Sequence, residues 1–304
     1  MIRILLILGT VLAGSTIGSA QSTEMFIQDI SWSPDGKYLA FSGMHDIDRS
    51  ANKMKADIYV IRVDGSDQKK ITGDEKNEFY TSWAKGRIAF GSQTPGQKDS
   101  KIFTANADGS DLRQISSGGG RDSTPSISID GKKIVFGSTR GAEKSQIYVM
   151  NADGSDATRL THDPAIGYFN PQFSPDNKRI VYYAEKGDGK DQVWVMNSDG
   201  SNQMLLTANI GHNIFPGWSP DSKRIIFSSS KRDATSTGSN VLGSFLYIMN
   251  ADGSGLKKLG QINSFFARFS PDGKRIAYVS GDFPKSAIYI ADADGSAAVQ
   301  ITKP

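Results

Sequence analysis

The segment Asn151-Ala152-Asp153-Gly154-Ser155 decides the fold, because close copies of it recur along the chain. Self-similarity at a fixed spacing, here about 46 residues, is typical of small units that stack to bury a common core. Asp-Gly is also a strong signal for the tight turn of a β-hairpin. The repeat therefore predicts an array of small β units. The other copies are centred on Asp64, Asp108, Asp199, Asp252 and Asp294.

A second turn motif, Ser-Pro-Asp-Gly-Lys at 33–37, or a relative of it precedes the Asp-Gly-Ser turn within each unit; the copy in the second unit, Ala84-Lys85-Gly86-Arg87, is degenerate. Pro and Gly at these positions favour a type I turn that closes a hairpin. A nearly continuous apolar run such as Ile134-Val135-Phe136 follows, which is typical of a strand buried on both faces. A third strand ends at the Asp-Gly-Ser turn and a short fourth strand closes the unit. Six such units predict an all-β, six-bladed β-propeller with four antiparallel strands per blade.

We expect three segments along the chain. Residues 1–20 contain one early charge, an apolar stretch and the small residues Gly18-Ser19-Ala20, which is the layout of a cleaved signal peptide. The alternative is a membrane anchor, but the apolar stretch is short and is diluted by Gly, Ser and Thr. Residues 21–29 form an N-terminal extension and 30–304 the propeller. The blades are expected at about 30–72, 81–116, 125–161, 171–207, 216–260 and 267–302.

The composition excludes several classes of function. The chain has no Cys, which excludes disulfides, Cys-ligated metals and Cys nucleophiles, and export without disulfides favours a bacterial periplasm. The formal net charge of +3 is too small and too dispersed to indicate nucleic-acid binding. The nucleophile motif Gly-x-Ser-x-Gly and the metal motif His-Glu-x-x-His do not occur. The three His residues are spread around the expected ring, so we predict no metal site and no cofactor.

The two turn motifs and the strands between them resemble the repeat of the TolB-like six-bladed propeller family, most clearly over Ser138 to Tyr182. The resemblance extends over residues 30–302 and implies a periplasmic protein of the bacterial envelope. The α/β domain that precedes the propeller in TolB is not expected here. We therefore predict an exported, non-enzymatic, monomeric module without a membrane span, which binds an envelope protein or peptide, or a glycan. The alternatives are a glycan lyase or hydrolase that uses polar residues of the central channel, and an inert domain separated from a larger enzyme.

The connections between blades carry the candidate site. The residues around the start of each innermost strand should ring one mouth of the central channel, on the face opposite the Asp-Gly turns. Aromatic side chains beside Asp and Asn have the composition of a binding mouth. The alternative is that some of the aromatic side chains only wedge between adjacent blades. Two long loops, 42–56 and 228–244, belong to the same face. The predicted ligand-binding or partner-binding residues are Asp29, Phe79, Tyr80, Asp122, Tyr168, Phe169, Asn170, Asn213, Phe215 and Phe266, and no catalytic residue is predicted.

Overall fold

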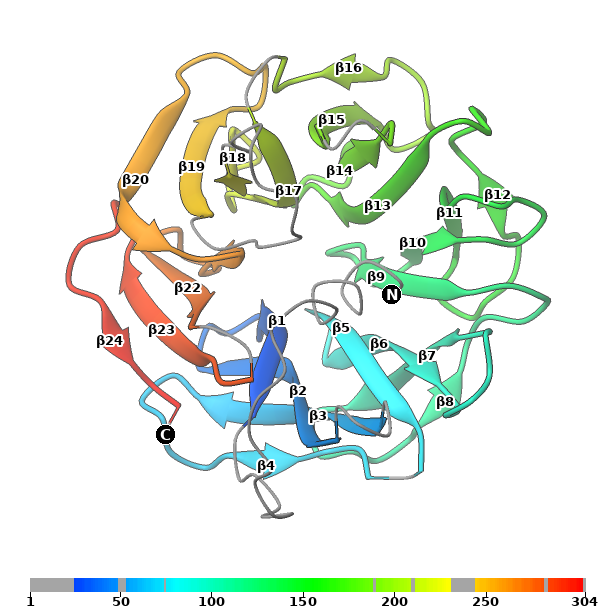
Figure 1. The fold of residues 1–304 in the computed structure, drawn as a ribbon, viewed down its shortest axis with the longest axis horizontal. Helices are drawn as coiled ribbons and strands as arrows, with labels where there is room; N and C mark the ends of the chain where they lie inside the picture. Colours follow the sequence, from blue (N-terminus) through cyan, green and yellow to red (C-terminus); the bar gives the residue numbers. More distant parts are fainter. Residues whose placement is uncertain are drawn as a thin grey trace, which may run out of the picture.

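Six four-stranded antiparallel sheets are arranged around a common centre, with the first strand of each sheet innermost (Figure 1). The computed structural model describes residues 25–48, 53–73, 75–187, 190–208, 211–230, 244–281 and 284–302. These residues contain strands and turns but no helix, so none of the described segments is a helix that could span a bilayer. The predicted all-β, six-bladed propeller is confirmed. The predicted signal peptide, residues 1–20, lies outside the described residues.

Each blade is built from one continuous stretch of the chain. Blade 1 contains β1 (Phe26–Trp32), β2 (Tyr38–Asp48), β3 (Lys53–Arg62) and β4 (Lys69–Lys70). Blade 2 contains β5 (Asn77–Ala84), β6 (Arg87–Gln93), β7 (Lys101–Asn106) and β8 (Arg113–Gln114). Blade 3 contains β9 (Asp122–Ile127), β10 (Lys133–Ser138), β11 (Gln146–Asn151) and β12 (Thr158–Arg159).

The remaining blades follow the same order. Blade 4 contains β13 (Gly167–Phe173), β14 (Arg179–Glu185), β15 (Gln192–Asn197) and β16 (Met204–Leu205). Blade 5 contains β17 (His212–Trp218), β18 (Arg224–Ser230), β19 (Phe245–Asn250) and β20 (Lys257–Asn263). Blade 6 contains β21 (Phe266–Phe269), β22 (Arg275–Ser280), β23 (Ala287–Asp292) and β24 (Val299–Gln300).

The innermost strands begin earlier than the sequence pattern suggested. β1 starts at Phe26, so Phe26 to Asp29 belong to blade 1, although the propeller was expected from residue 30. β5 likewise starts at Asn77 rather than near residue 81. Irregular register within these strands breaks the alternation of side chains on which a sequence-based boundary depends. The segments expected to be connections are therefore partly strand.

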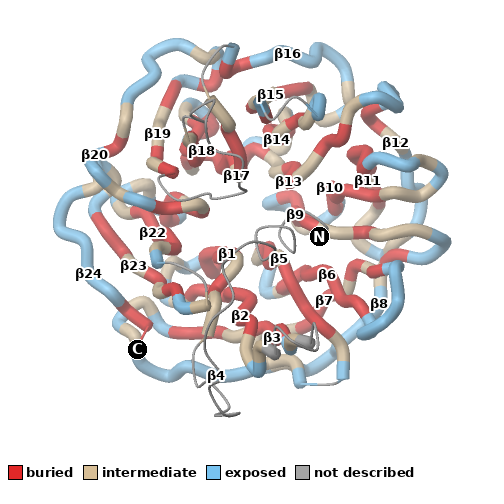
Figure 2. Tube along the Cα trace, viewed as in Figure 1, coloured by how far each residue is buried: buried red, intermediate tan, exposed pale blue. Residues whose placement is uncertain are grey.

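The hydrophobic core lies between neighbouring blades. The second strands are buried on both faces, as the apolar runs predict: Ile134, Val135 and Phe136 are at most 1% exposed. One cluster joins blade 1 to blade 6 through Ile30 and Ile288. Figure 2 shows buried residues along the inner strands and exposed residues around the rim. Each blade therefore needs both neighbours to cover its faces.

Blades 1 and 6 close the ring without sharing a strand. The backbone N–H of Ile27 donates to Ser286 Oγ at 2.7 Å, and Trp32 Nε1 donates to the carbonyl oxygen of Arg268 at 3.1 Å. The apolar cluster at this junction adds to these two hydrogen bonds. Closure therefore depends on the apolar cluster and on hydrogen bonds between the first and last blades, which include one from the backbone N–H of Ser286 to the carbonyl oxygen of Met25 at 3.2 Å.

The Asp-Gly-Ser turns repeat one hydrogen-bond pattern in all six blades. In blade 2, the backbone N–H and the hydroxyl of Ser110 both donate to Asp108 Oδ1, at 2.9 and 2.6 Å. The hydroxyl hydrogen bond lowers the pKa of Asp108. Glycine is required in the middle, because Gly154 has φ of +91° and its missing Cβ would collide with the carbonyl oxygen of Ile115.

The Ser-Pro-Asp-Gly turns lie on the same face and contact one another around the ring. Within blade 1, Ser33 Oγ donates to Asp35 Oδ1 at 2.6 Å. Between blades 3 and 4, the N–H of Ile129 donates to Asn177 Oδ1 at 2.9 Å. We call this side of the propeller the turn face. The opposite side, which carries the connections between blades and the loops between second and third strands, is the loop face.

Candidate binding site at the loop-face mouth

Four of the innermost strands hold a residue in the left-handed backbone region at the same aligned position. Their register is shifted by a β-bulge next to this position, whereas β21 pairs regularly with β22. A positive φ in a bulky or β-branched residue costs about 1–3 kcal/mol and clusters at functional sites. Bulges of this kind re-aim side chains. The four residues are Tyr80 (φ 60°), Thr124 (φ 50°), Asn170 (φ 50°) and Phe215 (φ 54°).

Arg268 of β21 reaches across the channel to blades 4 and 5. Its Nη1 atom donates to the carbonyl oxygens of Ala267 (2.9 Å) and Phe215 (3.3 Å), and its Nη2 atom donates to Asn170 Oδ1 (3.3 Å). The guanidinium carbon lies 4.1 Å from the ring centre of Phe266. Gly217 leaves room for it, since an added Cβ there would come within 3.0 Å of Nη1. One cation thus links three blades at the mouth.

Asp29 is fully buried in the inner strand of blade 1. It accepts hydrogen bonds from the hydroxyl of Ser42 at 2.6 Å and the hydroxyl of Thr81 at 2.9 Å. The backbone N–H groups of Ser42 and Thr81 also donate to it. Burial raises the pKa of Asp29, and these hydrogen bonds oppose that shift. Its carboxylate therefore fastens blade 1 to blade 2.

The charge of Asp29 acts on Tyr80 in blade 2 and on Arg268 in blade 6. Burial raises the pKa of Tyr80, and the Asp29 carboxylate raises it further. Burial lowers the pKa of Arg268 to about 9, although Asp29 acts in the opposite direction. Tyr80 remains partly exposed. The charge of Asp29 therefore acts on both the phenol of Tyr80 and the guanidinium of Arg268.

Aromatic side chains form an arc along blades 4, 5 and 6. Phe169 stacks on Tyr183 with ring centres 5.4 Å apart, and Tyr183 meets Phe215 edge-on at 5.8 Å. Phe215 contacts Phe266 at 5.4 Å, and Arg268 covers the latter. Phe169, Tyr183 and Phe215 are partly exposed. We call Phe169, Tyr183, Phe215 and Phe266 the aromatic arc.

The structure buries six further residues that we predicted at the site. Asp122 is held by Ser138 Oγ at 2.6 Å and Arg140 Nη2 at 2.7 Å. Tyr168 packs on Tyr182 with ring centres 5.9 Å apart. These side chains support the strands and loops around the mouth, whereas Tyr80, Phe169 and Phe215 remain partly exposed. The six buried residues are Phe79, Asp122, Tyr168, Asn170, Asn213 and Phe266.

Sequence reasoning missed Arg268, although a signal was present. Two residues before the turn Ser, the other blades have Ser31, Ser82, Ser126, Gln172 and Gly217. Three of these are serines: Ser31 donates to Thr81 Oγ1 at 2.9 Å, and the hydroxyls of Ser82 and Ser126 accept inter-blade hydrogen bonds. A single Arg among small or uncharged residues departs from the repeat. That departure could have identified it.

His45 lies in blade 1, at the loop-face end of β2. Its Nε2 atom is 2.6 Å from Asp57 Oδ2, which also accepts from Lys70 Nζ at 3.0 Å. Its Nδ1 atom is 3.3 Å from Asp46 Oδ2. The hydrogen bond with Asp57 is the main cause that raises the pKa of His45. Within the described ranges, no group of three His, Asp or Glu side chains is placed to hold a metal ion.

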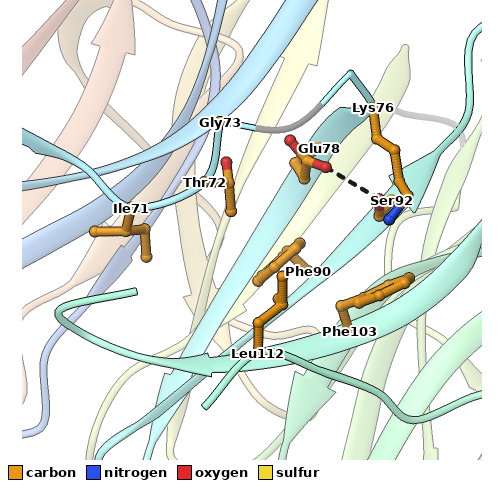
Figure 3. A pocket seen from close by; sticks show the side chains of 9 residues that line it. All are labelled: Ile71, Thr72, Gly73, Lys76, Glu78, Phe90, Ser92, Phe103 and Leu112. Carbon is orange, nitrogen blue, oxygen red and sulfur yellow. Dashed lines mark hydrogen bonds between the residues drawn. The ribbon is translucent and has the colours of Figure 1, made fainter. Parts of the chain in front are cut away.

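A small pocket of about 110 Å³ lies between the blade 1–2 connection and strands β5 to β7 of blade 2 (Figure 3). Phe90 and Phe103 form its apolar wall, and Lys76 Nζ lies 4.9 Å from the ring centre of Phe103. Glu78 at its rim accepts from Ser92 Oγ at 3.1 Å. The pocket contains none of the residues that we predicted for the site.

Comparison with known proteins identifies the class. The model of the TolB beta propeller domain matches residues 138–244. The structure of TolB from Acinetobacter baumannii superposes with a TM-score of 0.67 at 18% identity, over 91% of this chain and 63% of that chain. A putative TolB from Agrobacterium tumefaciens gives a TM-score of 0.66 at 24% identity, over 84% of this chain and 91% of that chain. The protein is a TolB-like β-propeller.

A second family model covers more of the sequence. The model of the dipeptidyl peptidase IV N-terminal region matches residues 11–189, and the chain belongs to that family. Dipeptidyl-peptidase 5 of Porphyromonas gingivalis is 34% identical over 91 residues, which are 28% of this chain and only 13% of that protein. An oligogalacturonate lyase of Vibrio parahaemolyticus shares the fold with a TM-score of 0.58 at 14% identity, over 93% of this chain and 80% of that chain. The fold is thus common to proteins with different activities.

Proposed function

We propose that this protein is a non-enzymatic binding module, which takes a protein or peptide of the cell envelope at the loop-face mouth. The observation that carries the proposal is the row of left-handed residues, Tyr80, Thr124, Asn170 and Phe215, in four consecutive inner strands. Blade 6 has a regular inner strand, so the propeller architecture does not require the bulge. Strain that the fold does not need is best explained by what the side chains present to a ligand.

The composition of the mouth supports a peptide ligand. The aromatic arc offers flat apolar surface, while Tyr80 and Arg268 supply a hydroxyl group and a cation beside it. Large aromatic side chains and Arg are the residues that most often dominate binding energy at protein interfaces. Oxygen atoms and backbone groups of a peptide could pair with the polar residues while its apolar side chains cover the arc.

The proposed location is the periplasm. It rests on the signal-like segment at residues 1–20, the absence of Cys and the similarity to TolB structures. N-terminal sequencing of the protein recovered from a periplasmic fraction tests it, with Gln21 as the expected first residue. A chain that retains Met1 in the cytoplasm would contradict the proposal.

The second candidate is an enzyme that acts on a glycan in the central channel. The fold similarity to an oligogalacturonate lyase keeps this candidate open. Incubation with oligogalacturonate, followed by detection of the unsaturated product of a lyase, separates the two candidates. Turnover that is lost on changing channel residues would favour the enzyme.

The experiment that tests the binding role is capture of envelope proteins by the purified propeller, followed by binding measurements with each purified partner. The test variants are Tyr80→Ala, Phe169→Ala and Phe215→Ala. Ile129→Ala is the matched control, because Ile129 is an apolar side chain 51% exposed on the turn face. We expect each test variant to weaken binding by about 2 kcal/mol at an almost unchanged melting temperature. Equal binding by all four variants would place the functional surface elsewhere.

A further inference from the structure

We infer that the loop-face mouth recognises a carboxylate, and that the ligand is a peptide whose C-terminal carboxylate binds the guanidinium of Arg268. This inference rests on the proposed function and adds to it the chemical group that is recognised. It follows from the unpaired charge of Arg268, from the position of that charge in the channel and from the apolar surface beside it.

Within the described part of the chain, the guanidinium of Arg268 is a cation without a salt-bridge partner. Its hydrogen bonds go to two carbonyl oxygens and to the amide oxygen of Asn170. Among the described residues, no carboxylate lies within salt-bridge distance of it, whereas Arg140 in the same ring is paired with Asp122 at 2.7 Å. A guanidinium has five N–H donors in a planar fork that suits the two oxygens of a carboxylate. Arg268 therefore retains both charge and donors for an incoming anion.

Asp29 is a carboxylate whose charge acts on Arg268, and its oxygens already accept hydrogen bonds. Ser42 and Thr81 supply four hydrogen bonds to it. Burial lowers the pKa of Arg268 to about 9, which still leaves the guanidinium protonated at neutral pH. Removing a charge from water without a counter-charge is costly, so an anionic ligand would gain more here than at the surface.

The surroundings of Arg268 favour the end of a chain. Its guanidinium extends from blade 6 to Asn170 in blade 4, and thus lies across the channel. A terminal carboxylate needs only one covalent continuation, which can leave toward the loop face. The aromatic arc lies beside the guanidinium and would cover the apolar side chain of the last residue. An acidic side chain within a chain would need room for two continuations beside Arg268.

The test uses two pools of short synthetic peptides of random sequence, identical except that one pool has free C-termini and the other has C-terminal amides. Peptides retained by the immobilised full-length protein are identified by mass spectrometry, and the tightest binder is titrated. We expect retention from the free-acid pool. Amidation of that peptide and the variant Arg268→Gln should each weaken binding by about 10- to 100-fold, which is the usual effect of losing a hydrogen-bonded charge pair. Arg268→Lys should bind with intermediate affinity, because it keeps the charge but not the fork.

Asn170→Asp is the matched variant that separates recognition from a structural role. It places a carboxylate of nearly the same shape where the amide oxygen now lies, 3.3 Å from Arg268 Nη2. Asp tolerates the left-handed backbone that this position requires. The internal carboxylate should take the place of the ligand, so we expect peptide binding to fall at least tenfold while the melting temperature does not fall.

Several results would overturn the inference. Equal binding of acid and amide peptides would show that the C-terminus is not recognised. Retention that follows internal Asp or Glu would assign the carboxylate to a side chain, and binding of oligogalacturonate in place of peptides would assign it to a glycan. A loss of melting temperature in Arg268→Gln that fully accounts for its lost binding would make Arg268 a structural link. If Tyr80→Ala and Phe215→Ala abolish peptide binding while amidation and Arg268→Gln do not, the proposed function stands and this inference fails.

Discussion

The two mouths of the channel differ in how faithfully they follow the repeat. On the turn face, Asp108, Asp153 and their four counterparts each accept two hydrogen bonds from the Ser two residues later. On the loop face, the aligned position four residues before the turn Ser is occupied by five residue types in six blades. Repetition marks what every blade needs in order to fold. Departure from it marks residues that the fold leaves free for another role.

The backbone shows the same difference. On the turn face, positive φ falls on glycine, as at Gly154, where no Cβ can fit, and mostly on Asp or Asn elsewhere, which tolerate this region; the exceptions are Lys85, Ser222 and Ala297. The loop face places Tyr80, Thr124 and Phe215 in the same backbone region without the relief that glycine would bring. The large aromatic residues with positive φ therefore lie at the mouth, whereas most such residues on the turn face are of types that tolerate this region. This comparison can be tested by changes that act on one face at a time.

The largest effect should come from opening the ring on which both faces depend. Deleting residues 265–304 removes blade 6 and exposes the apolar faces of blades 1 and 5, including the cluster around Ile30 and Phe41. We expect the truncated chain to lose soluble expression, because each blade is covered only by its neighbours. Solubility and near-UV circular dichroism measure the outcome. A soluble truncated chain with native near-UV signal would show that the blades are independent.

Substitutions of two neighbouring residues of the aromatic arc should distinguish a role in the hydrophobic core from a role in the binding site. Phe266 is 2% exposed, so Phe266→Ala should reduce the free energy of unfolding by about 3–5 kcal/mol. Phe215 is partly exposed and strained, so Phe215→Ala should cost less stability and about 2 kcal/mol or more of binding. Denaturant unfolding and partner titration on both variants measure this. Equal destabilisation by the two changes would make the whole arc core.

A glycine on the turn face should not tolerate a Cβ. Gly154→Ala places a methyl group against the carbonyl oxygen of Ile115 at φ of +91°, and we expect it to cost about 2 kcal/mol or more of unfolding free energy. Gly141→Ala is the control, since its φ is +65° and a Cβ there would contact no atom within 4 Å. Only the shared backbone penalty should remain in the control. The difference between the melting temperatures of the two variants measures the cost of the collision at position 154. Equal melting temperatures would show that the collision has no measurable cost.

The sequence made the turn face predictable because its chemistry is local. Asp, Gly and Ser act on neighbours within a few residues, so the motif alone defines the turn and its spacing defines the blade. The loop-face mouth depends on contacts that no local pattern contains: Arg268 and Asn170 meet although they are 98 residues apart. Periodicity also could not show which predicted residues, such as Phe79 and Tyr80, are buried or exposed, because the bulge interrupts the alternation between them.

On the loop face, exchanging a residue of positive φ for glycine should stabilise the protein, whereas removing the glycine at Gly154 on the turn face should destabilise it. Thr124 has φ of +50°, and its buried hydroxyl has no hydrogen-bond partner among the described residues. Thr124→Gly relieves about 1–3 kcal/mol of strain and loses about 0.5–1 kcal/mol to chain entropy, so we expect a gain of about 1 kcal/mol. Thr104→Gly in the regular strand β7 is the control and should destabilise, because Thr104 Oγ1 accepts from Arg87 at 2.6 Å. Destabilisation by Thr124→Gly would mean that the mouth is not strained.

The smallest expected effects are two losses of stability with pH. The turn face should lose stability at acid pH, and the loop face should lose stability as the pH rises; we call these the acid limb and the alkaline limb. On the turn face, the hydroxyl hydrogen bond from Ser110 lowers the pKa of Asp108 below 3.8, so its contribution is complete above pH 3.8 and is lost as the pH falls through the folded pKa. On the loop face, Asp57 raises the pKa of His45 above 6.5, so that contribution is complete below pH 6.5 and is lost as the pH rises through the folded pKa.

Two variants assign these limbs. His45 faces Asp57 and Asp46, and Lys70 also pairs with Asp57. His45→Gln should therefore flatten the loss of melting temperature above pH 6.5, while Asp108→Asn should slightly reduce the loss below pH 3.8 and leave the other limb intact. Melting temperatures between acid and mildly alkaline pH measure both limbs. If His45→Gln leaves the alkaline limb unchanged, the His45–Asp57 pair does not stabilise blade 1, and the pH response of the protein does not distinguish the two faces.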